Sequence, residues 1–189
     1  MSTTPPPLLR EILEAGRRFD FSMPSDQEAG SLLRVLAAAK PGGNFLELGT
    51  GLGLSLAWLR DGADENATIT SLDNEPRYVE FAAECFAFDK RVSVVCADGA
   101  QWLDHYRGTG FDLIFADTWP GKYHHLEPAL QLLKHGGLYV IDDMLPQDNW
   151  PEGHAEKASA LLERLATHPL LVTCRLDWST GVLIAVRRG

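Results

Sequence analysis

Acidic residues recur at or beside the ends of short apolar segments in this chain. They are Glu47, Asp73, Asp98, Asp117 and the pair Asp142 and Asp143. One or two such carboxylates are expected as helix caps or turn formers, but a series of them at equivalent places indicates a site. Carboxylate oxygens suit a cationic ligand, the hydroxyls of a sugar or a hard divalent ion.

Glycines follow the first of these acidic residues, in the stretch ELGTGLGLS at 47–55. Glycines at this spacing let a ligand come close to the backbone. The stretch lacks the lysine of a Walker-type phosphate loop, and it meets the dinucleotide pattern GxGxxG only in part. Glu47 at the mouth of the loop would repel a pyrophosphate, whereas Asp73 follows at a distance that suits a ribose contact. S-adenosylmethionine fits better, because it carries an ammonium, a sulfonium and a ribose but no phosphate.

Size and charge limit the class of protein. The chain has 189 residues, 45% of them hydrophobic, and a net charge of −9. This suits a single globular domain and argues against a nucleic-acid partner, which requires a basic face. The apolar runs are too short to span a membrane, and the first residues lack the features of a secretory signal, so we expect a cytoplasmic protein. Three scattered cysteines are interpreted as reduced and mostly buried.

Helix-like and strand-like segments alternate along the chain. The predicted helices are 8–18, 26–39, 53–62, 76–89, 99–106, 123–137 and 154–168, and the predicted strands are 44–49, 67–73, 91–98, 111–117, 138–143, 170–178 and 181–188. The first five strands lack polar alternation, which is typical of a parallel sheet covered on both faces. We therefore expect an α/β, doubly wound, mostly parallel seven-stranded Rossmann-like sheet in one domain, 1–189. An N-terminal helical extension, 1–39, precedes the core, 40–189, and an antiparallel hairpin ends it.

The glycine loop, Asp73, and the later ADTW and IDD segments at 116–119 and 141–143 together resemble the class I methyltransferases. More narrowly, they resemble the small O-methyltransferases related to catechol O-methyltransferase, over about residues 20–188. The resemblance implies an S-adenosylmethionine-dependent enzyme that methylates an oxygen of a small molecule. It also implies that the N-terminal helices are candidates for packing against a second subunit in a homodimer.

The same resemblance assigns residues to the cofactor. They are Met23, Glu47, Gly49, Thr50, Gly51, Ser55, Asp73, Asn74, Asp98, Gly99 and Asp117. In this assignment Ser55 binds the methionine carboxylate, Asp73 takes both ribose hydroxyls, and Asp98 with Gly99 flanks the adenine. Met23 would lie near the methyl group, and the alternative is a core or interface methionine.

The resemblance also matches Asp117, Asp142 and Asp143 with the ligands of a divalent metal, Mg²⁺ or a similar ion. Such a metal lowers the pKa of one of two vicinal hydroxyls and so prepares the attacking oxygen. Asp143 departs from the family, which has an amide there. The alternative is that Asp143 caps the following loop while Asp142 only approaches the cofactor or substrate.

Lys122 and Asp117 are the candidate catalytic residues. The catechol enzyme has a lysine at the position of Pro120, and Lys122 comes two residues later. Either the loop bends and brings Lys122 into the site, or Lys122 is a surface lysine. His124 and His125 follow as further base or ligand candidates, or as polar surface.

Two tryptophans, Trp119 and Trp150, are candidates for the walls of an acceptor pocket, or else they hold their loops against the core. Other functions remain open from the sequence. The protein could bind S-adenosylmethionine without a metal or without catalysis, be an NAD-dependent oxidoreductase, or transfer an aminopropyl group.

Overall fold

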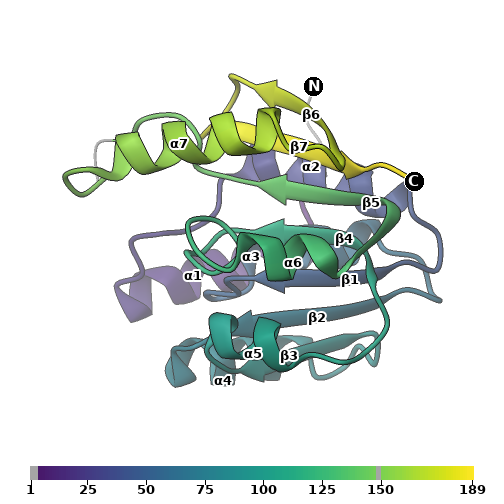
Figure 1. The fold of residues 1–189 in the computed structure, drawn as a ribbon. Helices are drawn as coiled ribbons and strands as arrows, with labels where there is room; N and C mark the ends of the chain where they lie inside the picture. Colours follow the sequence, from purple (N-terminus) through teal and green to yellow (C-terminus); the bar gives the residue numbers. More distant parts are fainter. Residues whose placement is uncertain (1–3, 148–149) are drawn as a thin grey trace.

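A computed structural model describes residues 4–147 and 150–189, so residues 1–3 of the predicted extension lie outside it. Its centre is a seven-stranded sheet with the order β3-β2-β1-β4-β5-β7-β6 (Figure 1). The strands are β1 (Asn44–Leu48), β2 (Thr68–Asp73), β3 (Val92–Cys96), β4 (Phe111–Ala116), β5 (Leu133–Ile141), β6 (Leu171–Leu176) and β7 (Val182–Arg187). The α/β sheet predicted from the sequence is confirmed.

Strand direction confirms the predicted C-terminal hairpin. The pairs among β1 to β5 are parallel, whereas β7 runs antiparallel to both β5 and β6. The strand order reverses at β1, which lies between β2 and β4. Leu48 at the end of β1 is level with Leu72 and Ala116 of these neighbours. Because ligands bind beyond the carboxyl ends of parallel strands at such a reversal, the residues that follow these three strands form the expected site.

Helices cover both faces of the sheet (Figure 1). They are α1 (Leu9–Phe19), α2 (Gln27–Ala38), α3 (Leu54–Gly62), α4 (Pro76–Phe86), α5 (Gly99–His105), α6 (Leu126–Gln131) and α7 (His154–Ala166). Alternate strand residues serve the two faces: Phe45 packs with α1 to α4, and Leu46 packs with α5 to α7. None of the described helices is both long enough and apolar enough to cross a membrane.

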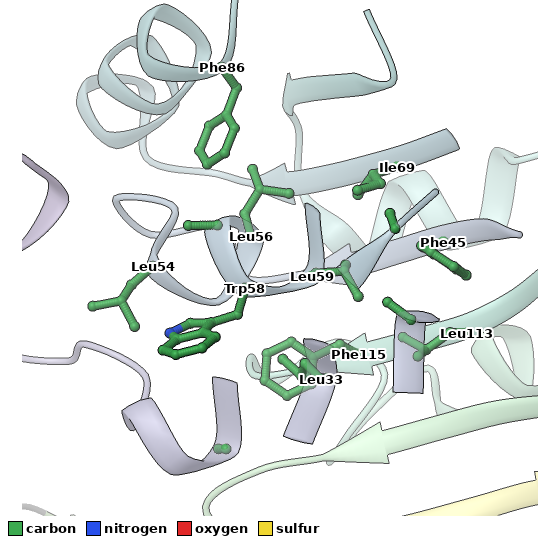
Figure 2. Close-up of a cluster of buried hydrophobic side chains, with 14 of the residues drawn as sticks. Leu33, Phe45, Leu54, Leu56, Trp58, Leu59, Ile69, Phe86, Leu113 and Phe115 are labelled. Atoms are coloured by element: carbon green, nitrogen blue, oxygen red, sulfur yellow. The ribbon is translucent and has the colours of Figure 1, made fainter. Parts of the chain in front are cut away.

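The N-terminal helices share the core of the sheet instead of standing apart from it. Leu33 of α2 lies beside Trp58 of α3 and Phe115 of β4 in one buried cluster (Figure 2). Gly30 permits this packing, because a Cβ at that position would overlap the Trp58 ring. Asp26 begins α2 by accepting hydrogen bonds from the amides of Glu28 and Ala29 at 2.7 and 3.4 Å.

One predicted element is wrong in its second half. The sequence predicted a helix over 123–137, but α6 ends at Gln131 and β5 already begins at Leu133. Leu133 pairs with Phe111 of β4, and Lys134 forms an ion pair with Asp112 at 2.6 Å. The apolar run LQLL fits a helix or a strand equally well by periodicity, and pairing with β4 decides between them.

All three cysteines are free, but the prediction that they are mostly buried is wrong. Cys96 and Cys174 are exposed. These two residues lie on β3 and β6, which are the outer strands of the sheet. An outer strand has a neighbour on one side only, so its side chains are covered less completely.

Candidate active site

The glycine loop connects β1 to α3 and passes close to the end of β4. Gly49 and Gly51 have φ values of 104° and 51°, which a side chain would strain. The amides of Gly49 and Thr50 both donate to the carbonyl of Leu72 at 2.8 and 3.0 Å. A Cβ at Gly49 would stand 3.0 Å from the carbonyl oxygen of Asp117. Glycine is therefore required here for tight packing of the loop as well as for its turn.

Asp73 at the end of β2 holds this loop in place. Its Oδ2 accepts a hydrogen bond from the Gly51 amide at 2.8 Å, and its Oδ1 accepts one from the Glu75 amide at 3.0 Å. The strand-end and cofactor interpretations of Asp73 are compatible, because each carboxylate oxygen has a second lone pair for a ligand hydroxyl. A cleft beside it is lined by predicted cofactor residues, namely Gly49, Asp73, Asn74, Asp98 and Gly99.

Glu47, two residues before the first glycine of the loop, is completely buried and does not stand open at the mouth of the loop as predicted. Burial raises the pKa of this carboxyl to about 7, and a hydrogen bond from Ser71 opposes the shift. The Ser71 hydroxyl donates to Glu47 Oε2 at 2.5 Å and is itself 2.5 Å from the Thr50 hydroxyl. The Thr50 side chain thus faces this buried network, and it does not line the cleft.

Two buried polar atoms beside the loop, Glu47 Oε1 and the Ser55 hydroxyl, make no hydrogen bond of normal geometry within the described part of the chain. The Ser55 hydroxyl nevertheless lies close enough to Glu47 to lower the pKa of its carboxyl. Buried polar groups in proteins are nearly always hydrogen-bonded, so such atoms call for an explanation. Both lie next to a glycine loop that a ligand can approach closely. The pair fits a ligand with an ammonium and a carboxylate, which are the groups of an amino-acid end.

Asp117 and Asp142 end the neighbouring strands β4 and β5. Burial is the largest influence on both carboxyls and raises the pKa of each. Ser25 donates its hydroxyl to Asp117 Oδ2 at 3.1 Å. Asp142 Oδ1 accepts from the Thr180 hydroxyl and, at 2.8 Å, from the amide of Asp143. The N-terminal segment and the β6–β7 turn therefore both reach the carboxylates.

Sequence reasoning missed Ser25 and Thr180. Ser25 and Asp26 are adjacent N-cap candidates for α2, and Asp26 takes that role, which leaves the Ser25 hydroxyl available. Thr180 lies in the turn between β6 and β7. Two adjacent cap candidates were a usable signal for Ser25, since a helix needs only one N-cap. Thr180 gave no comparable signal, because its contact depends on where β7 enters the sheet.

The loop after β4 bends and carries Lys122 into the protein. The Lys122 amide donates to the carbonyl of Trp119 at 3.1 Å, and Tyr139 donates its hydroxyl to the Gly121 carbonyl at 2.6 Å. Lys122 is only 4% exposed, and its Nζ donates to the backbone carbonyl of Asp142 at 2.8 Å. The alternative of a surface lysine is wrong.

The three aspartates do not fit a divalent metal as they are arranged. Across 4–147 and 150–189, no group of three or more His, Cys, Asp or Glu side chains has a geometry that could hold a metal ion. One oxygen of Asp142 is already engaged by Thr180 and the Asp143 amide, and the ammonium of Lys122 adds positive charge beside it. Mg²⁺ requires several oxygen ligands in octahedral geometry, and this donor set with an ammonium beside it is unsuited to that.

Aromatic side chains gather next to Lys122. The rings of Trp119 and Tyr123 are 5.6 Å apart, and Trp150 lies 4.5 Å from the His154 ring. Tyr123 and His154 share a hydrogen bond of 2.8 Å between Oη and Nε2. The ammonium of Lys122 is 5.7 Å from the centre of the Tyr123 ring. These contacts place both predicted tryptophans in one aromatic cluster near the strand ends.

Three predicted candidates lie away from this arrangement. Met23 is 68% exposed on the loop between α1 and α2, and it does not line the cleft. The Nδ1 atoms of His124 and His125 are 2.9 Å apart, and His125 Nε2 lies 3.3 Å from a carboxylate oxygen of Asp104 on α5. The two histidines thus interact with each other and with α5, as expected for polar surface residues.

Comparison with known proteins defines the class. Residues 46–144, just over half of the chain, match the sequence model of a family described as a methyltransferase domain. A Mycobacterium tuberculosis protein named as an O-methyltransferase is 27% identical over 168 residues, which cover 84% of this chain and 75% of that protein. The chain therefore belongs to the methyltransferase domain family, and it is a class I methyltransferase of the small O-methyltransferase type.

Solved structures agree on the fold. The O-methyltransferase TomG of Streptomyces achromogenes, in complex with S-adenosylmethionine, has a TM-score of 0.85 at 22% identity, covering 100% of this chain and 93% of that one. The O-methyltransferase of Bacillus cereus, in complex with S-adenosylhomocysteine, has a TM-score of 0.81 at 22% identity, covering 95% and 90%.

Proposed function

We propose that this protein transfers the methyl group of S-adenosylmethionine to an oxygen atom of a small, flat acceptor. Membership of the methyltransferase family supports the reaction class, and the names of the relatives support oxygen as the acceptor atom. The net charge of −9 argues against an anionic polymer as the acceptor. The aromatic cluster of Trp119, Tyr123, Trp150 and His154 favours a flat one.

The observation that carries the proposal is the pair of unpartnered atoms beside the glycine loop. Glu47 Oε1 and the Ser55 hydroxyl are buried and make no hydrogen bond of normal geometry among the described residues. A carboxylate at this place attracts an ammonium or sulfonium and repels a diphosphate. An amino-acid end with both charges satisfies both atoms, whereas the pyrophosphate of NAD offers no positive charge to Glu47.

In the proposed reaction, bound S-adenosylmethionine supplies a methyl group on a sulfonium. Asp73 would bind the ribose hydroxyls with the lone pairs that the loop amides leave free, and Asp98 and Gly99 would border the adenine. Asp117 would lie close to the sulfonium, because its carbonyl stands beside Gly49. The aromatic cluster would then hold the acceptor, and holding both reactants in line is the main source of rate.

Calorimetry with S-adenosylhomocysteine tests the cofactor site. Asp73→Ala should abolish binding, because it removes both the ribose ligand and the clamp on the Gly51 amide. Glu80→Ala is the matched control, since Glu80 is an exposed carboxylate on the helix that follows. Thermal melting checks that Asp73→Ala is folded. Unchanged binding in Asp73→Ala would contradict the assignment.

An assay of methyl transfer to a panel of phenols and other small hydroxyl compounds tests the reaction itself. We expect methyl ethers with the wild type and none with Asp73→Ala. Cofactor binding without transfer to any acceptor would indicate a non-catalytic protein.

A further inference from the structure

Lys122 is a buried cation whose hydrogen-bonding capacity is only partly used. Its side chain is 4% exposed, and within the described residues its Nζ has one hydrogen-bond acceptor, the carbonyl of Asp142. An ammonium carries three N–H groups. The remaining N–H groups therefore lack protein partners in a place where bulk water has little access.

The surroundings fix this ammonium at the junction of β4 and β5. The backbone of Lys122 is held by the hydrogen bond from its amide to the Trp119 carbonyl, and that of Gly121 by the Tyr139 hydroxyl. The Lys122 Nζ is held by the Asp142 carbonyl at the end of β5. Its charge is close enough to act on the carboxyls of Asp117 and Asp142 against the effect of their burial. The aromatic residues beside it are Tyr123, whose ring centre is 5.7 Å from Nζ, and the exposed Trp119.

We infer that Lys122 serves as a built-in cation of the acceptor site, in place of a divalent metal. The inference rests on the proposed function and deepens it. The free N–H groups of Lys122 donate to the acceptor oxygen and stabilise the negative charge on it, as oxyanion-stabilising donors do in other enzymes. The aspartates around it balance its charge and are not metal ligands.

The reaction balances without a metal. The acceptor hydroxyl gives its proton to water, and its oxygen forms a bond to the methyl carbon. The carbon–sulfur bond breaks, and its electron pair stays on sulfur, giving a methyl ether and S-adenosylhomocysteine. Because a single ammonium binds one oxygen and forms no chelate, the acceptor needs only one aromatic hydroxyl. A catechol should have no advantage over a matched phenol.

A manganese titration of the full-length wild type, followed by electron paramagnetic resonance, tests the inference without requiring activity. We expect no binding of Mn²⁺ by the wild type and a gain of binding in Lys122→Ala, in which the three aspartates lose the competing ammonium. Binding by the wild type that is lost in Asp142→Asn would overturn the inference.

Turnover supplies the second test. We expect wild-type methyl transfer to a phenol to be unaffected by a chelator, and Lys122→Met to lose about 100-fold in kcat with unchanged binding of S-adenosylhomocysteine. Lys134→Met is the control, since Lys134 is exposed near the start of β5, remote from Asp142. Loss of wild-type turnover on chelation, or full turnover in Lys122→Met, would contradict the role of Lys122.

The two proposals fail in different ways. If the wild type binds no S-adenosylhomocysteine, the proposed function is wrong, and the manganese titration still decides whether Lys122 excludes a metal. If the wild type methylates phenols but requires a metal, the proposed function stands and the role of Lys122 is wrong.

Discussion

Burial of the Glu47 carboxyl destabilises the unliganded fold, and in the proposed function the same carboxyl binds the cofactor. It is fully buried, its Oε1 has no partner in the described chain, and burial raises its pKa from 4.5 to about 7. A group with a raised folded pKa stays protonated in the folded state where the unfolded chain has already lost the proton. Ionised Glu47 therefore destabilises the folded protein, and the effect grows as pH rises from about 4.5 to about 7.

Substitution of Glu47 by glutamine should remove this effect. We expect Glu47→Gln to match the wild type in unfolding free energy near pH 4.5 and to exceed it by about 3 kcal/mol above pH 7. Urea denaturation across this pH range measures the difference. Glu65→Gln is the control, because Glu65 is exposed and should show no such trend. Equal pH dependence in the two variants would refute the burial argument.

The site residues show how far a sequence can predict individual side chains. Asp73 and Asp98 line the cleft beside the glycine loop, where the strand ends predict them, whereas Glu47 is fully buried and not at the mouth of the loop. The sequence does not decide whether Lys122 is buried or exposed. The bend of its loop depends on the left-handed conformation of Gly121 and on the hydroxyl of Tyr139 on β5. Contacts made across the fold leave little trace in local sequence.

Close packing of α2 on α3 positions the end of the glycine loop. Gly30 faces the Trp58 ring, and Gly62 faces the backbone of Arg34. Since α3 begins directly after Gly53, a displacement of this helix would move the loop to which we assign the cofactor contacts. Stability and cofactor binding are thus linked through one helix pair.

A methyl group at Gly30 should disturb this pair. We expect Gly30→Ala to lower the unfolding free energy by at least about 1 kcal/mol, because its Cβ overlaps the indole ring and overpacking exceeds the gain in helix propensity. Gly16→Ala on α1 is the matched control. No atom of residues 4–147 and 150–189 lies within 4 Å of a Cβ placed at Gly16, so this variant should gain about 0.5–1 kcal/mol. Chemical denaturation compares them, and equal stability of the two variants would argue against the predicted overlap.

Element prediction succeeded where flanking signals were clear and failed where they were not. Pro76 and the cap from Glu75 mark the start of α4. No such signal separates α6 from β5, and the boundary is decided by pairing of Leu133 with Phe111 across the sheet. The strand order β3-β2-β1-β4-β5-β7-β6 also depends on pairing between distant segments.

At the scale of the whole molecule, the strand order and the acidic strand ends converge on one edge of the sheet. Asp73, Asp117 and Asp142 end or follow β2, β4 and β5 there, beside the loop that follows β1. An edge of this charge attracts a cationic nucleoside. The single domain over 1–189, the homodimer and the cytoplasmic location stay predictions, for which size-exclusion chromatography with light scattering tests the homodimer.

Titration calorimetry of the wild type with S-adenosylhomocysteine and, separately, with NAD tests the central claim most directly. We predict saturable heat with S-adenosylhomocysteine and none with NAD, because the Glu47 carboxyl lies beside the loop where a diphosphate would have to lie. Saturable heat with NAD and none with S-adenosylhomocysteine would contradict the account.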